Sequence, residues 1–150
     1  MKGSAMSATP TFSPRLIGET EKTLNAILDR HLAASDLTEQ HWITLSFAIA
    51  SGGAIDRNEL VRQVVRQAKF SEHDVRARVS ELVDRKLLDD SALAELTVTE
   101  AGAQLHAQIR AANTELTARL WGDLPAEQLA TTAQVLAVVL ERANAELARV

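Results

Sequence analysis

The 150-residue sequence contains no cysteine and no tyrosine, and aromatic residues make up only 3% of it. The absence of cysteine excludes a disulfide framework, a thiolate zinc site and a thiol nucleophile. No segment approaches the roughly 18 uncharged apolar residues that a membrane-spanning helix needs. We therefore expect a protein without a membrane partner, and a cytoplasmic location agrees with the lack of cysteine.

Motifs for catalysis and metal binding are also missing. The sequence has no phosphate-binding glycine loop and no nucleophile motif, so Gly52-Gly53 is interpreted as a turn and Asp89-Asp90 as a solvated loop. None of the four histidines forms a pair at compact metal-ligand spacing. They are His31, His41, His73 and His106. The sequence thus predicts no catalytic residue, no metal site and no cofactor, and it indicates that the protein is not an enzyme.

The N-terminal segment carries neither an apolar signal-peptide core nor a helical pattern. Residues 1–5 precede a second methionine and resemble a vector-derived remnant, so Met6 is interpreted as the native start. We expect residues 1–13 to be disordered and residues 14–150 to form one domain, since this length buries a substantial core.

Alanine and leucine dominate the remaining composition, which favours helices. Apolar residues recur at helical spacing in six segments. These predicted helices cover about 14–34, 38–50, 57–69, 72–86, 100–120 and 125–147. Asp56 and Ser71 are predicted N-caps, and Pro125 stands where a helix start tolerates proline. Between the fourth and fifth helices, Leu87-Leu88 and Glu95–Val98 flank a polar stretch and predict a short two-stranded hairpin.

Basic charge is concentrated in residues 57–86. This segment has eight basic and five acidic residues, a net charge of +3, in a chain whose net charge is −4. Such an island indicates a site for a polyanion, although arginines on the solvated faces of two amphipathic helices would give the same count. The order of helix, tight turn, helix and hairpin is that of a winged helix-turn-helix, whose second helix lies in the DNA major groove.

The predicted DNA contacts follow from helical spacing over 57–86. Five residues near the start of the 72–86 helix are expected to face the bases: Ser71, His73, Arg76, Ala77 and Ser80. Four basic residues are expected to bind phosphates: Arg62, Arg66, Lys69 and Arg78. The same helix also carries four acidic residues that repel phosphate, which counts against tight binding: Glu72, Asp74, Glu81 and Asp84.

Several short segments, in this order and spacing, resemble the MarR family of bacterial transcription regulators. They are Leu37-Thr38-Glu39-Gln40-His41-Trp42, Asn58-Glu59-Leu60, residues 75–88, Val98-Thr99-Glu100-Ala101-Gly102 and Leu124-Pro125-Ala126-Glu127. The resemblance implies a mostly α-helical fold, with a winged DNA-binding lobe over 36–98 and dimerisation helices over 14–35 and 99–150. It also implies a homodimer on double-stranded DNA with a palindromic operator, acting as a repressor that responds to small aromatic or phenolic effectors.

Four residues are candidates for effector contact under this resemblance: His31, His41, Trp42 and Phe47. Core packing is the alternative for each of them, because a histidine or aromatic on an apolar face is usually structural.

Two positions depart from the family pattern. Lys86 stands where glycine is usual at the end of the recognition helix, and the wing between residues 89 and 95 has no basic residue. A second hypothesis therefore stays open, in which a winged-helix dimer without strong DNA binding serves as a protein-interaction or ligand-sensing module.

Overall fold

The computed structural model describes residues 9–149. For residues 1–8 the predicted disorder therefore lies outside the described residues, and residues 9–13 form neither helix nor strand. The chain divides into two compact units, residues 1–112 and residues 113–150. No helix within 9–149 is long and apolar enough to cross a membrane.

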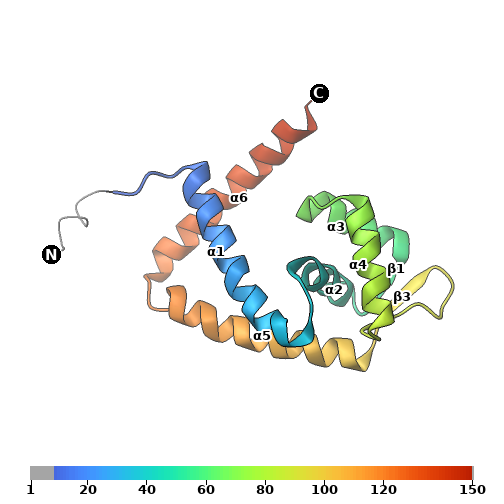
Figure 1. The fold of residues 1–150 in the computed structure, drawn as a ribbon. Coiled ribbons are helices and arrows are strands. Elements are labelled where there is room, and N and C mark those ends of the chain that lie inside the picture. The colour runs from blue at the N-terminus through green and yellow to red at the C-terminus, as the bar shows by residue number, and fades with distance from the viewer. Residues whose placement is uncertain (1–8, 150) are drawn as a thin grey trace. The chain divides into compact units, whose positions relative to one another are not determined.

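The first unit holds the winged-helix lobe, preceded by a long N-terminal helix (Figure 1). Its elements, in chain order, are α1 (Pro14–Leu32), the short 3-10 turn η2 (Ala33–Ser35), α2 (Glu39–Ala50), β1 (Ala54–Asp56), α3 (Arg57–Ala68), α4 (Glu72–Asp84), β2 (Leu88–Asp89), β3 (Glu95–Val98) and the first part of α5 (Glu100–Trp121). The predicted helices are confirmed to within a few residues at their ends.

Side-chain caps explain where several of these helices begin. Asp56 Oδ2 accepts the backbone N–H of Glu59 at 3.0 Å, and Ser71 Oγ accepts that of Asp74 at 3.1 Å. Both predicted N-caps are thus confirmed. Thr99 caps α5 in the same way, since its Oγ1 accepts the N–H of Gly102 at 3.0 Å. Each cap satisfies a backbone donor that the first helical turn leaves unpaired.

The wing belongs to a three-stranded antiparallel sheet in the order β1-β3-β2. The predicted two-stranded hairpin was therefore incomplete, because β1 pairs with β3 on the side away from β2. A three-residue strand is too short to show an alternating pattern, and its place is set by the pairing of buried Ile55 with buried Leu96. The loop between β2 and β3 extends from the lobe as the wing (Figure 1).

The core of the lobe is formed by apolar residues of the helices and the sheet. The largest side chains that are less than 2% exposed include Leu45, Leu60, Leu82, Leu88, Leu96, Val64, Val75 and Val79. They come from α2, α3, α4, β2 and β3, and buried Ile55 of β1 belongs to the same cluster, so every element of the winged lobe from α2 to β3 contributes to it. This packing holds α3 and α4 in a defined orientation.

Lys86 accepts a left-handed conformation, with φ of 63°. The N–H of Leu87 donates to the carbonyl of Leu82 at 2.9 Å, and the N–H of Lys86 donates to that of Val83 at 2.9 Å. This pair of bonds is a Schellman motif, which normally places glycine at the left-handed position. The lysine therefore keeps the turn that glycine would form and bears its strain.

The second unit consists of the end of α5, the turn at residues 122–125 and α6 (Ala126–Ala148). Pro125 directly precedes α6, as predicted from its tolerance at helix starts. No residue of α6 is buried among the described residues. Its large apolar side chains Val135, Leu136, Val138 and Leu140 are 40–60% exposed.

Candidate nucleic-acid interface

The helix-turn-helix is formed by α3, a three-residue turn and α4. Lys69 ends α3 in a left-handed conformation with φ of 64°, and its N–H donates to the carbonyl of Val65 at 3.1 Å. Ser71 then caps α4. Buried Val64 on α3 and Val75 on α4 belong to the same core cluster, so the two helices form one rigid unit.

The outward face of α4 carries the residues that were predicted to meet bases. Ser71, His73, Arg76 and Ser80 are exposed, and Ala77 is half-buried. The opposite face, formed by Val75, Val79 and Leu82, is buried. Helical geometry alone produces this division, since 100° per residue separates the two sets.

A shallow groove of about 400 Å³ lies between α3 and α4. Three arginines line it, Arg62 and Arg66 from α3 and Arg76 from α4. Its other lining residues are Asn58, Val61, Val65 and Glu72. A solvent-open groove with three guanidinium groups offers many donors to an anionic ligand such as a phosphate backbone.

Acidic neighbours engage two of these three arginines. Arg62 Nη2 lies 2.8 Å from Glu59 Oε1, and Arg76 Nε lies 2.8 Å from Glu72 Oε2. The hydrogen bond from Arg62 lowers the pKa of Glu59, so this carboxylate stays charged. Among residues 9–149, Arg66 has no carboxylate within ion-pair distance. Arg66 is therefore the arginine of the groove whose charge is least compensated by the chain.

Lys69 lies at the end of α3, next to the turn. Its Nζ donates to the carbonyl oxygen of Arg66 at 2.6 Å, and the residue is exposed. The ammonium group therefore stays at the surface beside the start of α4. Of the four predicted phosphate ligands, Arg62, Arg66 and Lys69 lie on α3 and its C-cap, at the surface.

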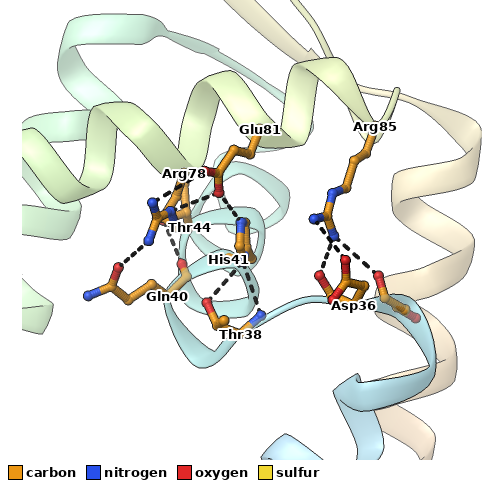
Figure 2. Close-up of polar contacts among 9 residues, drawn as sticks. Asp36, Thr38, Gln40, His41, Thr44, Arg78, Glu81 and Arg85 are labelled. Carbon is orange, nitrogen blue, oxygen red and sulfur yellow. Dashed lines mark hydrogen bonds and ion pairs between the residues drawn. The ribbon is translucent and has the colours of Figure 1, made fainter.

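Arg78, the fourth predicted phosphate ligand, points the other way, toward α2 (Figure 2). Its Nη1 donates to Gln40 Oε1 at 3.2 Å, and its Nε lies 3.0 Å from Glu81 Oε1. The side chain is 25% exposed. The structure thus does not bring Arg78 together with the groove arginines but uses it to join α4 to the start of α2.

His41 is the centre of the same connection (Figure 2). The ring is buried, its Nδ1 accepts the backbone N–H of Thr38 at 3.0 Å, and its Nε2 donates to Glu81 Oε1 at 2.6 Å. With Nδ1 as an acceptor, the proton of the neutral ring is on Nε2. Burial is the main cause that lowers the pKa of His41, and the hydrogen bond from His41 lowers the pKa of Glu81.

Of the other predicted effector residues, Trp42 forms a contact that the sequence did not suggest. Its ring stacks on His106 of α5 at a centroid distance of 4.5 Å and an interplanar angle of 12°. Ser46 Oγ lies 3.1 Å from His106 Nε2. Ser46 and His106 were missed because 60 residues separate them, and neither carries a motif. Burial lowers the pKa of His106, which keeps the stacked ring neutral.

The two remaining effector candidates, His31 and Phe47, form no polar contact that would indicate a ligand site among the described residues. Phe47 is half-buried and packs against the core cluster. The Nδ1 atom of His31 is buried and has no hydrogen-bond partner among the described residues. No three His, Asp or Glu side chains of residues 9–149 are grouped as metal ligands would be.

The wing carries acidic rather than basic charge. Asp89, Asp90 and Glu95 lie in or beside it, and no lysine or arginine occurs between residues 87 and 99. Arg57 Nη2 at the start of α3 lies 3.2 Å from Asp90 Oδ2, which ties the base of the wing to α3. Such a wing lacks the arginine that would bind a narrow minor groove.

No protein-family model and no curated protein matches the chain. Solved structures do match over most of its length. A MarR family transcriptional regulator from Silicibacter pomeroyi is 22% identical, with a TM-score of 0.72, over 94% of this chain and 92% of that one. A mutant MarR from E. coli complexed with operator DNA is 20% identical, with a TM-score of 0.67, over 84% and 91%.

A third match is the organohalide-sensing RdhR transcriptional regulator in its 2,4-dichlorophenol bound form. It is 16% identical, with a TM-score of 0.70, over 85% of this chain and 77% of that one. The chain has the MarR fold. The predicted fold class, a mostly helical winged helix-turn-helix with long terminal helices, is therefore confirmed. Within the MarR fold, α3 and α4 form the helix-turn-helix, and the β2–β3 loop is the wing.

Proposed function

We propose that the protein is a DNA-binding transcriptional regulator, a ligand-responsive repressor that binds a palindromic operator as a homodimer. The observation that carries this proposal is the exposed face of α4 beside a groove lined by Arg62, Arg66 and Arg76. Recognition helices of this kind enter the major groove while basic residues beside them bind phosphates. The likeness to a MarR complexed with operator DNA supports the proposal.

Fluorescence polarisation with DNA that flanks the protein's own gene tests DNA binding. Phosphate contacts release counterions, so the affinity is expected to fall steeply with salt. Arg66→Ala is expected to weaken all sequences alike and to reduce the salt slope by about one unit. Arg15→Ala on α1, outside the basic segment, is the matched control and should leave the slope unchanged. An equal slope for both variants would remove Arg66 from the phosphate contacts.

The homodimer is proposed because α6 exposes a row of large apolar residues that its own unit does not cover. Apolar patches of this kind usually mark an interaction surface. Sedimentation at micromolar concentration is expected to give about twice 16.3 kDa. Leu136→Asp, at a 40% exposed position of α6, should shift the protein toward the monomer. A clean monomer for the unchanged protein would refute the homodimer and the two-half-site operator.

Repression and the palindrome are tested together on the operator. A protected region with two-fold symmetry in a footprinting experiment is expected, because a symmetric dimer presents two α4 helices to two half-sites. Deleting the gene should raise transcription of the flanking genes if the protein represses them. A fall in that transcription would indicate an activator instead.

A phenolic effector is proposed at Trp42, where the ring already stacks on His106. The RdhR match in its 2,4-dichlorophenol bound form supports a ligand of this chemistry. The Trp121→Phe variant leaves Trp42 as the single tryptophan, so quenching of its fluorescence by 2,4-dichlorophenol reports binding near it. Binding should also release DNA. Unchanged fluorescence and DNA affinity at millimolar phenol would contradict this assignment.

A second candidate is a winged-helix dimer that binds proteins or ligands and has little affinity for DNA. The wing favours this hypothesis, because it is acidic and its Asp90 already pairs with Arg57. The polarisation experiment distinguishes the two candidates. Binding that stays weak even at low salt, with a salt slope near zero, would favour the second.

A further inference from the structure

The guanidinium group of Arg76 is held by acceptors from two helices. Its Nε donates to Glu72 Oε2 at 2.8 Å, one turn earlier on α4, and its Nη2 donates to Asn58 Oδ1 at 3.2 Å, on the first turn of α3. The Arg76 side chain is 44% exposed. An arginine at the surface normally samples many rotamers, so two acceptors from different directions restrict this one unusually well.

These two hydrogen bonds leave part of the guanidinium able to bind another group. Of its five N–H donors, one on Nε and one on Nη2 are engaged, and both on Nη1 and the second on Nη2 remain. Two parallel donors are what the O6 and N7 acceptors of guanine require in the major groove. Donors therefore remain on both Nη1 and Nη2, and an end-on bidentate contact uses one from each.

Glu72 also influences which ligand Arg76 can accept. Its carboxylate is 65% exposed and lies beside the guanidinium, so a phosphate that approached Arg76 would meet a negative charge. A guanine edge carries no net charge and meets no such repulsion. Arg66, in the same groove, has no carboxylate within ion-pair distance among the described residues and suits a phosphate better.

Stability is a poor explanation for this arrangement. Exposed ion pairs contribute little to folding, because solvent screens them and the side chains lose rotamer freedom. The hydrogen bond that Asn58 accepts from a surface arginine on another helix is subject to the same limits. Orientation is the property that these contacts change most, since a fork that is misplaced by an ångström loses one of its two hydrogen bonds.

We infer that Asn58 and Glu72 are positioning residues that aim Arg76 at a guanine and so determine sequence specificity at one base pair of each half-site. This inference rests on the proposed DNA-binding function. Asn58 orients the guanidinium from α3, and Glu72 both orients it and directs it away from phosphate. Arg76 is the residue of the three that contacts the base.

The experiment compares variants on a panel of operators that differ by single base pairs, starting from a site selected with the unchanged protein. Arg76→Ala is expected to reduce the preference for guanine at one position of each half-site by about 5- to 150-fold. Asn58→Ala, which removes an acceptor, and Glu72→Gln, which removes the charge that keeps phosphate away from Arg76, should each reduce the same preference and leave those at other positions intact. Neither should reduce it further when combined with Arg76→Ala, since both act through that residue.

Glu72→Gln should change the overall affinity and the base preference in opposite directions, a combination that the loss of a negative charge alone does not produce. Removing a negative charge should raise the affinity for all DNA sequences, while the discrimination at the Arg76 position falls. Glu59→Gln, which removes the carboxylate beside Arg62, is the matched control. It should raise affinity for all sequences and change no base preference. Asn58→Asp, which keeps an oxygen acceptor, should retain the guanine preference that Asn58→Ala reduces.

Circular dichroism establishes that each variant is folded, which the exposure of the three side chains favours. Unchanged base preferences in Asn58→Ala and Glu72→Gln would overturn the inference while DNA binding stands. A uniform loss of affinity in Arg76→Ala, with its rank order of sites intact, would overturn it as well. If the unchanged protein binds no selected sequence, the proposed function fails and the inference fails with it.

Discussion

The winged-helix lobe and helix α6 differ in the exposure of their apolar residues. Leu82, on the inner face of α4, has no exposed surface, whereas Leu140 of α6 is 60% exposed. The lobe closes a core with residues from α2 to β3, joined by Leu28 and Leu32 of α1 and Ile109 of α5. Helix α6 has a comparable supply of valine and leucine but no buried residue among those described. The core of the lobe is thus covered by the chain itself, whereas the apolar residues of α6 would be covered by a second copy in the proposed homodimer.

The largest effect is expected from opening the core of the lobe. Leu82→Ala removes a fully buried side chain and leaves a cavity, which should lower the free energy of unfolding by about 2–5 kcal/mol. Urea denaturation followed by circular dichroism measures it. Leu140→Ala is the matched change in α6.

The loss for Leu140→Ala should appear mainly as a weaker dimer, with a stability that depends on protein concentration. If Leu82→Ala and Leu140→Ala lose equal stability at every protein concentration, the proposed difference between the lobe and α6 is wrong.

The next largest effect on stability is expected at Gly102, which lies close to the backbone of Leu87. A Cβ atom on Gly102 would overlap the backbone carbonyl oxygen of Leu87, so the start of α5 and the beginning of the wing must separate in Gly102→Ala. Overpacking of this kind costs about 1–3 kcal/mol. A Cβ atom on Gly18 of α1 would meet no atom within 4 Å, so Gly18→Ala should instead raise stability by about 0.5–1 kcal/mol. Thermal unfolding should therefore give a lower melting temperature for Gly102→Ala and a higher one for Gly18→Ala.

The link between α2 and α4 predicts a pH dependence that α6 does not share. Burial lowers the pKa of His41, so the unfolded chain binds a proton more readily than the folded one. The stabilising effect of the neutral ring is present above the unfolded pKa of about 6.5 and is lost as the pH falls through that value toward the folded pKa. Protonation of Nδ1 would also remove its hydrogen bond with the Thr38 N–H.

Urea denaturation between pH 7.5 and pH 5.5 should therefore show falling stability, with a shallower fall in His41→Gln. His106→Gln is the second variant, because burial lowers the pKa of that ring too. A slope that neither substitution changes would contradict the assignment of the pH dependence to these two histidines.

The smallest effect is expected at the end of α4. Lys86 has φ of 63°, and a side chain in the left-handed region costs about 1–2 kcal/mol. Lys86→Gly relieves that strain but adds freedom to the unfolded chain, so a net gain of about 0.5–1 kcal/mol is expected. Lys86→Ala keeps a Cβ and should give no comparable gain. Differential scanning calorimetry resolves such shifts, and a loss of stability in Lys86→Gly would contradict the strain.

Much of the fold was predictable because its signals are local. N-caps such as Asp56 and Ser71 act on N–H groups three residues away, and the buried face of α4 follows from helical periodicity. The strand β1 was missed because three residues show no period, and its identity depends on pairing with β3, about forty residues later. The exposed faces of α3 and α4 were predicted for the same local reason as the helices.

The directions of individual side chains were less predictable. Arg76 and Arg78 are two residues apart on α4, yet one faces the groove with α3 and the other joins α2. Helical geometry places them about 200° apart, but it does not tell which neighbouring element each one meets. The stacking of Trp42 on His106 likewise depends on how α2 packs against α5.

The sequence by itself determined the helices, their caps, their buried faces and the basic segment, because these depend on residues within a few positions of one another. Only the tertiary structure decided which acceptors hold each arginine, where His41 finds Glu81, and which third strand completes the sheet. The contacts between these elements join positions 18 to 43 residues apart. They form only when the apolar core brings whole elements together, and the local sequence around one partner does not indicate the other.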